Sequence, residues 1–198
     1  MVKRRVVKRP VIKRRPVQSA AFPIDTRLHP ALAEQRARFR EELNTTPELR
    51  LRWAALMISE QSGAAMQTVG ETMVNRANAW GVSLSDIVNN ERYYAPHQNK
   101  SFHRHLAALA RDETRLQRIY AMQDGILDGS NRSNLATHNA SAHVAVRARR
   151  TQTVCHMENG ETYTRKDKNP AEHGAGVIAR EKAWHRRTLE AMRENPPQ

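Results

Sequence analysis

A helical pattern that ends in Glu60 constrains the fold of this chain more than any other segment. Thr46 is placed as the N-cap, before Pro47 and an acidic first turn, and this combination signals the start of a helix. Apolar side chains then recur at helical spacing along one face, at Leu49, Trp53, Leu56 and Met57. The next position on that face is Glu60, and Gly63 follows as a stop signal. The sequence therefore predicts a short helix whose apolar face ends in a carboxyl group.

The position of Glu60 has a chemical consequence. Apolar neighbours and the negative end of the helix dipole both disfavour the charged form of a carboxyl group. A carboxyl group that stays protonated near neutral pH can act as a general acid, for example by protonating the leaving oxygen of a glycosidic bond. The alternative interpretation is an ordinary solvated glutamate in the last turn of a helix.

Helical patterns account for most of the remaining chain. Residues 29–44 are rich in Ala, Arg and Glu but carry few apolar side chains, so we expect a surface helix or a partner-binding extension there. Residues 64–80 place apolar side chains on one face before Gly81, which predicts a second core helix. Further helices are expected to open at residues 83–86 and to cover residues 101–111, 113–127 and 175–194.

Residues 142–165 have a different character. They contain β-branched runs, and the Asn159-Gly160 pair is typical of a tight hairpin turn. The predicted fold class is therefore mainly α (α+β), with helices around a single core and one small β-hairpin.

Composition and charge divide the chain further. With 198 residues and 39% apolar side chains, the chain can build one domain with extensions. The net charge is +13, and residues 1–17 alone contain eight Lys or Arg and no acid. We expect residues 1–25 to form a disordered basic arm, residues 26–45 a helical extension and residues 46–198 the main domain. The arm is expected to bind nucleic acid, an anionic envelope polymer or an acidic virion protein, or else to serve only solubility.

The chain shows neither an apolar stretch of the kind found in secretory signals nor one long enough to span a membrane. Cys155 is the only cysteine, which rules out a disulfide within the chain and fits a reducing compartment. The sequence thus predicts synthesis in a cytoplasm without an export signal.

Short motifs follow one another in a fixed order along the chain. Residues 58–63 end in an acid-plus-glycine turn, and residues 66–77 end in the pair Asn75-Arg76. An Asp-containing helix start at residues 84–88 and an aromatic-x-Pro element at residues 93–96 come next, and Ala136-Thr137 follows later. This order, over roughly residues 53–165, resembles the SleB-type cell-wall hydrolases. The resemblance implies a lysozyme-like fold that cleaves the glycan of peptidoglycan, with Glu60 as the catalytic acid.

The mechanism implied by this resemblance depends on the number of carboxyl groups. A muramidase normally uses two, about 5 to 9.5 Å apart, whereas a lytic transglycosylase uses one acid while a sugar hydroxyl closes an anhydro ring. The candidates for a second catalytic carboxyl group are Glu71, Asp86 and Glu91. The alternative for each is a solvated acid on the surface of a helix. The single-acid transglycosylase is slightly favoured. Without an export signal, such an enzyme fits a bacteriophage endolysin or an enzyme packaged in a virion.

Other polar and aromatic side chains near these motifs are of the kind that line carbohydrate grooves. The candidate substrate-binding residues are Asn75, Tyr93, Tyr94, Gln98, Thr137 and His138. Structural alternatives apply to several of them: a helix-end hydrogen bond for Asn75, half-buried packing for the tyrosines and a surface position for His138.

The available metal ligands do not have the spacing of a known zinc signature. They are His138, His143, Cys155, His156 and His173. Cys155 and His156 are adjacent in a predicted strand, where they would point to opposite faces, so they do not form a catalytic pair. No metal or cofactor is predicted. The alternative to an enzyme is a non-enzymatic protein that binds nucleic acid or lies inside a virion, which the basic arm favours.

Overall fold

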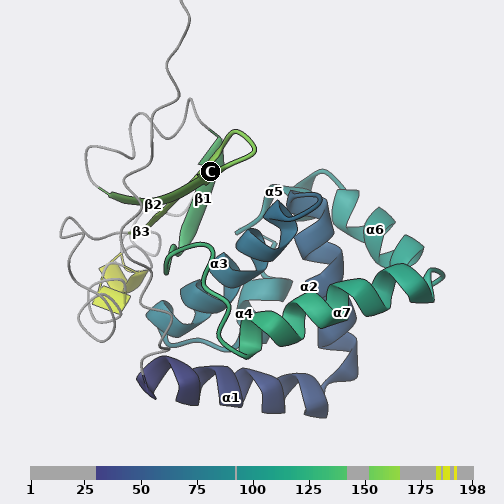
Figure 1. Cartoon of the computed structure of the whole chain (residues 1–198), viewed down its shortest axis with the longest axis horizontal. Helices are drawn as coiled ribbons and strands as arrows, with labels where there is room; N and C mark the ends of the chain where they lie inside the picture. Colours follow the sequence, from purple (N-terminus) through teal and green to yellow (C-terminus); the bar gives the residue numbers. More distant parts are fainter. Residues whose placement is uncertain are drawn as a thin grey trace, which may run out of the picture.

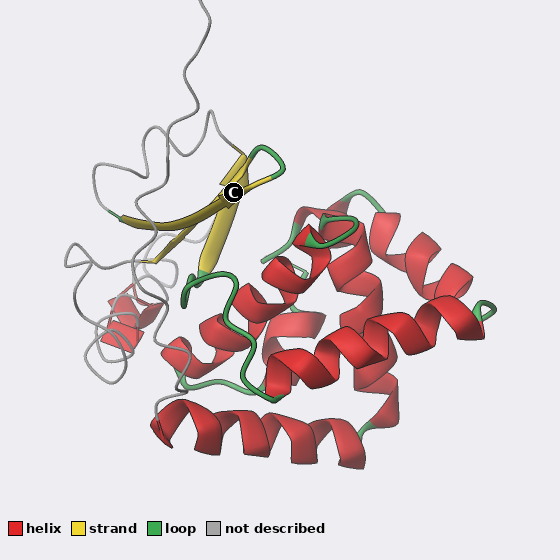
Figure 2. Cartoon of the chain, viewed as in Figure 1, coloured by secondary structure: helices red, strands yellow, loops and turns green. Residues whose placement is uncertain are grey.

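A computed structural model describes residues 30–91, 93–141, 152–165, 182–183, 185–187 and 190. Among these described residues, seven helices with defined bounds are followed by three strands, and these helices form one body with the sheet at one side of it (Figure 1, Figure 2). The helices are α1 (Pro30–Thr45), α2 (Pro47–Glu60), α3 (Ala65–Trp80), α4 (Leu84–Asn89), α5 (Ala95–Gln98), α6 (Ser101–Leu109) and α7 (Glu113–Leu127). The strands are β1 (His138–Ser141), β2 (Thr153–Glu158) and β3 (Glu161–Arg165). The predicted class, mainly helical with a small sheet, is confirmed.

Several sequence predictions fall outside the described residues. These include the basic arm at residues 1–25, the β-branched run at residues 144–146 and most of the helix predicted over residues 175–194. Within that last range, residues 182–183, 185–187 and 190 are helical.

Helix α3 lies at the centre of the helical body. Apart from Gln67, every residue from Ala65 to Trp80 is buried, whereas the sequence predicted one buried face. The reason is that α1, α2, α4, α7 and β1 all contact this helix. Gly70 makes the packing possible, because a Cβ atom there would lie 2.7 Å from Ile126 Cδ1 on α7 and 2.8 Å from Met57 Cε on α2. The buried polar residues of α3 consequently need partners inside the fold.

Helix α1 is part of the core, so the expectation of a surface helix is wrong. Phe39 and Leu43 are only 2% and 5% exposed, and they belong to the same apolar cluster as α2 and α3. Arg36 is also buried, and its Nη1 donates to the carbonyl oxygens of Ile126 at 2.6 Å and Ser130 at 3.2 Å. Helix α1 therefore packs through a few apolar residues together with a buried arginine that binds carbonyl groups at the end of α7 and just beyond it.

The helix ends follow the sequence signals in most cases. Gly81 ends α3 in the left-handed conformation, with φ 68°. Ser83 and Asp86 form a reciprocal capping box at the start of α4. Pro47 occupies the first turn of α2, but the Thr46 side chain makes no capping hydrogen bond. Helix α2 ends at Glu60 with Gln61 extended, and Gly63 belongs to the turn that follows.

The sheet is antiparallel with the strand order β1-β3-β2. The predicted hairpin joins β2 to β3, and its turn residues Asn159 and Gly160 have φ values of 49° and 78°, as a type I′ turn requires. Strand β1 was not predicted, because its four residues lack alternating apolar side chains. Its pairing with β3 makes the sheet three-stranded.

The tip of the hairpin is tied to the helical body through Glu158. Its carboxylate accepts hydrogen bonds from Thr68 Oγ1 on α3 at 2.6 Å and from Arg132 Nη2 at 2.9 Å. Burial raises the pKa of Glu158, but the Thr68 hydrogen bond and the Arg132 charge outweigh it and leave the pKa lowered. The carboxylate is therefore held in its charged form between α3 and the loop that precedes β1.

Candidate functional site

Glu60 lies where the end of α2 meets the sheet. It is the last residue of α2 and is half-buried. The amide nitrogen of Asn139, on β1, donates to Glu60 Oε2 at 3.4 Å. A carboxyl group from the helical body and a side chain of the sheet therefore meet at this junction.

Burial raises the pKa of Glu60, as its place at the end of an apolar helix face predicts. The Asn139 hydrogen bond and the positive charge of Arg76 act in the opposite direction, and the negative charge of Glu161 adds to the increase. Because desolvation dominates, the net effect favours the protonated carboxyl group. That is the form in which a carboxyl group can donate a proton.

Arg76 organises the surroundings of this carboxyl group, and the sequence reasoning did not propose it as a site residue. It is 5% exposed, and its Nε donates to the Thr137 carbonyl oxygen at 2.7 Å. Its guanidinium carbon lies 5.0 Å from the centre of the Tyr94 ring and 5.5 Å from that of Trp80. The signal that could have found it is the Asn-Arg pair at the end of α3.

The two candidate tyrosines have different environments. Tyr94 is buried, and burial raises its pKa to about 12 despite the opposing charge of Arg76. Tyr93 is half-buried, and its ring packs edge-on against Trp80 with 5.1 Å between the ring centres. Burial also raises the pKa of Tyr93. Both phenols thus stay protonated at neutral pH, Tyr94 beside Arg76 and Tyr93 beside Trp80.

The other candidate substrate-binding residues divide into internal and surface positions. The side-chain nitrogen of Asn75 donates to the Ala136 carbonyl at 3.1 Å and to Ser133 Oγ at 3.2 Å, so this buried amide holds the loop before β1. Thr137 is buried, and its hydroxyl is hydrogen-bonded to His138 Nδ1 at 2.8 Å. His138 is half-buried, with its ring 6.0 Å from Trp80. Gln98 is exposed at the end of α5.

The acids proposed as a second catalytic group have other roles or positions. Glu71 is fully buried and accepts hydrogen bonds from the Ser133 backbone nitrogen at 2.6 Å and from Ser130 Oγ at 2.5 Å. Asp86 completes the capping box of α4. Glu91 is exposed. Glu71 and Asp86 therefore stabilise local structure.

A serine and a histidine also meet near Glu60. Ser59 Oγ lies 2.8 Å from His105 Nδ1 on α6. The same hydroxyl donates to the Ala55 carbonyl oxygen at 2.6 Å, so its proton is directed into α2 and away from the imidazole. Burial lowers the pKa of His105. Because the serine proton is already committed to the helix, this pair does not have the arrangement of an activated nucleophile.

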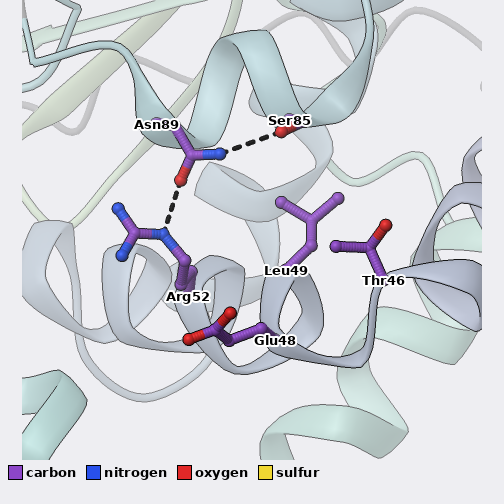
Figure 3. Close-up of a pocket in the computed structure, with 6 residues that line it drawn as sticks. All are labelled: Thr46, Glu48, Leu49, Arg52, Ser85 and Asn89. Carbon is purple, nitrogen blue, oxygen red and sulfur yellow. Dashed lines mark hydrogen bonds between the residues drawn. The ribbon is translucent and has the colours of Figure 1, made fainter.

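A separate pocket of about 320 Å³ lies between the first half of α2 and α4 (Figure 3). It is lined by Thr46, Glu48, Leu49, Arg52, Ser85 and Asn89. Three of its polar side chains pair with one another: Arg52 Nε donates to Asn89 Oδ1 at 2.5 Å, and Asn89 Nδ2 donates to Ser85 Oγ at 2.9 Å. The pocket faces the start of α2, whereas Glu60 is at the end of the same helix.

Among the residues that the structure describes, we see no arrangement of side chains that supports metal binding or thiol chemistry. In that part of the chain, no group of three His, Cys, Asp or Glu side chains could hold a metal ion. His143 and His173 lie outside it. Cys155 sits at an irregularity of β2 between Val154 and His156, so the simple alternation expected for Cys155 and His156 is interrupted there. None of the helices in the described ranges is long and apolar enough to cross a membrane.

Comparisons with known proteins give no family assignment. No family model matches the chain, and neither curated proteins nor solved structures give a match.

Proposed function

We propose that this protein cleaves the glycan strand of peptidoglycan, with Glu60 as the general acid. The observation that carries the proposal is a half-buried carboxyl group with a raised pKa at the junction of a helix and a sheet. An amide donor from Asn139 orients it, and Arg76 and Tyr94 lie in its surroundings. The ordered motifs that resemble SleB-type hydrolases, including lytic transglycosylases with a lysozyme-like fold, support peptidoglycan as the substrate.

The chemistry needs a proton where the glycosidic bond breaks. The protonated Glu60 gives its proton to the leaving oxygen as the bond to the anomeric carbon breaks. The anomeric carbon, on which positive charge develops, then reacts either with water, as in a muramidase, or with a hydroxyl of the same sugar, as in a lytic transglycosylase. A phage-encoded endolysin or virion enzyme is the biological setting that best fits such an activity in this chain.

The direct test is the turbidity of purified cell walls incubated with the native protein or with Glu60→Gln. Glutamine keeps the shape of the side chain but cannot donate a carboxyl proton, so we expect the rate to fall by a factor of about 10² to 10⁴. Glu41→Gln, which changes an exposed acid on α1, is the matched control and should keep the native rate. Equal activity of the native protein and Glu60→Gln would remove Glu60 from the mechanism.

A second candidate function rests on charge. Residues 1–17 carry eight Lys or Arg without an acid, which favours a protein that binds nucleic acid or lies inside a virion without being an enzyme. Binding of duplex DNA should then weaken steeply with added salt and disappear when residues 1–17 are deleted. Tight DNA binding by a native protein that leaves cell walls intact would favour this function over the enzymatic one.

A further inference from the structure

A short helical segment that follows the sheet packs against the end of α3 (yellow in Figure 1). Its described residues are 182–183, 185–187 and 190, and we call it the His185 segment. The rings of His185 and Trp80 are stacked, with 4.2 Å between their centres and 3° between their planes. His185 is 8% exposed, so the stack is buried. The segment is therefore attached to α3 through a face-to-face contact of two rings.

A second contact holds the same segment. The Lys182 side chain lies against Gly81, where α3 ends: a Cβ atom built on Gly81 would be 2.9 Å from Lys182 Nζ and 3.2 Å from Lys182 Cε. The lysine can lie this close because glycine has no side chain. Trp80 and Gly81 are neighbours in the chain, so both contacts join the His185 segment to the same end of α3.

The groups that face the stack from the body of the protein are a cation and two rings. The Arg76 guanidinium carbon of α3 lies 5.5 Å from the centre of the Trp80 ring. The Tyr93 ring centre lies 5.1 Å from the same point, and the His138 ring centre of β1 lies 6.0 Å from it. Burial raises the pKa of Tyr93, so its phenol is neutral at and below neutral pH.

The acids of this region do not pair with His185. Asp86 acts on the pKa of Tyr93 and caps α4. None of the ion pairs in the described part of the chain includes His185. The charged residues of the segment itself are all exposed, and they are Lys182, Arg186, Arg187 and Glu190. A proton on His185 would consequently be buried without a paired carboxylate.

Two effects act on a protonated imidazole in this position. A cation over an indole face is attracted to the ring, which favours protonation. Removal of the charge from water opposes protonation. Burial lowers the pKa of His185, so desolvation is the larger effect. The neutral imidazole is therefore the form that suits the stack.

We propose that the stack of His185 on Trp80 is a pH-sensitive latch, which holds the His185 segment on α3 while the imidazole is neutral and releases it when the imidazole takes up a proton. The released imidazole binds a proton more tightly than the stacked one. Docking is then complete above the ordinary histidine pKa and is lost as the pH falls through the lowered one. Release uncovers the indole face of Trp80, whether or not the protein cleaves glycans.

The test follows the His185 ring protons of the full chain by NMR from about pH 8 to about pH 5. Over an indole face these protons carry ring-current shifts, which disappear when the imidazole leaves the ring. We expect His185 to titrate below the ordinary value of about 6.5 and to lose its ring-current shifts in the same step. A midpoint above the ordinary value, or a stack that persists after protonation, would overturn the latch.

Hydrogen exchange of the backbone amides separates the latch from general acid unfolding, with the amides of α3 as the reference for an intact body. Protection of the native segment should fall by about tenfold per pH unit between the ordinary and the lowered pKa of His185. His185→Phe keeps an aromatic ring that cannot take up a proton, so its segment should stay protected. His185→Ala lacks the ring and should be unprotected at neutral pH as well.

The second imidazole near Trp80 needs its own control. His138→Gln removes it and should leave the transition of the segment at the native pH. Loss of the transition in His138→Gln would assign the pH dependence to His138 and overturn the proposal. Release of His185→Phe at the same pH as the native segment would overturn it too, because a group other than His185 would then control docking.

Discussion

The Glu60 side chain contacts two parts of the molecule. It is half-buried at the end of α2, and a residue of β1 donates a hydrogen bond to it. Sequence periodicity located this residue correctly at the end of an apolar helix face. It did not find Asn139 as a site residue, because the pairing of β1 with β3 places this strand beside the end of α2. A register between strands separated by other chain segments leaves no local periodic signal in the sequence.

The raised pKa of Glu60 predicts the direction of the pH dependence of activity. In the proposed mechanism the protonated form is the active one, so kcat/KM should fall as the pH rises through the pKa of Glu60. Asn139→Ala removes a hydrogen bond that lowers this pKa, and the alkaline limb should therefore move to higher pH. A rate–pH profile on a soluble glycan fragment measures this. A limb that moves to lower pH in Asn139→Ala would contradict the role of the amide.

The same pKa shift predicts a pH dependence of stability. The folded state holds the Glu60 proton more tightly than the unfolded state does, because burial raises the folded pKa. The contribution of Glu60 to stability is then largest at low pH and declines as the pH rises from the ordinary glutamate pKa through the raised one. Urea unfolding at several pH values should therefore show Glu60→Gln gaining stability relative to the native protein over this interval. A constant difference across the interval would mean that the pKa of Glu60 is unshifted.

At the scale of elements, the sequence predicted the structure best where a single residue type determines the backbone conformation. Gly81 as a helix stop, the helix start at residues 83–86 and the Asn159-Gly160 turn all have the predicted roles. The burial of α1 and the complete enclosure of α3 were missed, since both depend on neighbouring helices. Phe39 and Arg36 do not form an apolar stripe, so helical periodicity underestimated the packing of α1.

The crossing of α3 with α2 and α7 gives an element-scale prediction at Gly70. In Gly70→Ala, the new methyl group would meet Ile126 Cδ1 at 2.7 Å and Met57 Cε at 2.8 Å. Overpacking costs about 1 to 3 kcal/mol and the better helix propensity of alanine returns about 0.5 to 1 kcal/mol, so we expect a net loss of up to about 2 kcal/mol in urea unfolding. Adding Ile126→Val shortens the contacting side chain and should recover part of this loss. Gly125→Ala is the control: a Cβ there meets no atom within 4 Å, so only the helix-propensity gain of about 0.5 to 1 kcal/mol should appear.

At the scale of the whole molecule, α1 cannot be treated as a separable extension. Phe39 and Leu43 contribute to the common core, and Arg36 binds the carbonyl groups at the end of α7. A boundary at residue 46, which the sequence suggested, cuts through this core. The residues with the highest positive charge, 1–17, lie outside the described part of the chain, and the assignment of a disordered arm to residues 1–25 stays a prediction.

A chain that starts at residue 46 should consequently be much less stable than the full chain. Phe39→Ala alone is expected to lower the free energy of unfolding by about 3 to 5 kcal/mol, since it empties a filled position in the core. Arg38→Ala, on the exposed side of the same helix, removes only a surface ion pair with Glu34 and should change stability by less than about 1 kcal/mol. Thermal unfolding of the truncated chain and of both variants tests this. An equally stable truncated chain would show that the core closes without α1.

The hydrogen bond between Thr68 and Glu158 has a consequence for the hairpin at low pH. It attaches the hairpin tip to α3, and Arg132 in the loop before β1 contacts the same carboxylate. Because the pKa of Glu158 is lowered, this fastening is strongest above the ordinary glutamate pKa and is lost as the pH falls through the lowered one. Strong acid would therefore weaken the attachment of the hairpin tip to α3, even while Glu60 keeps its proton.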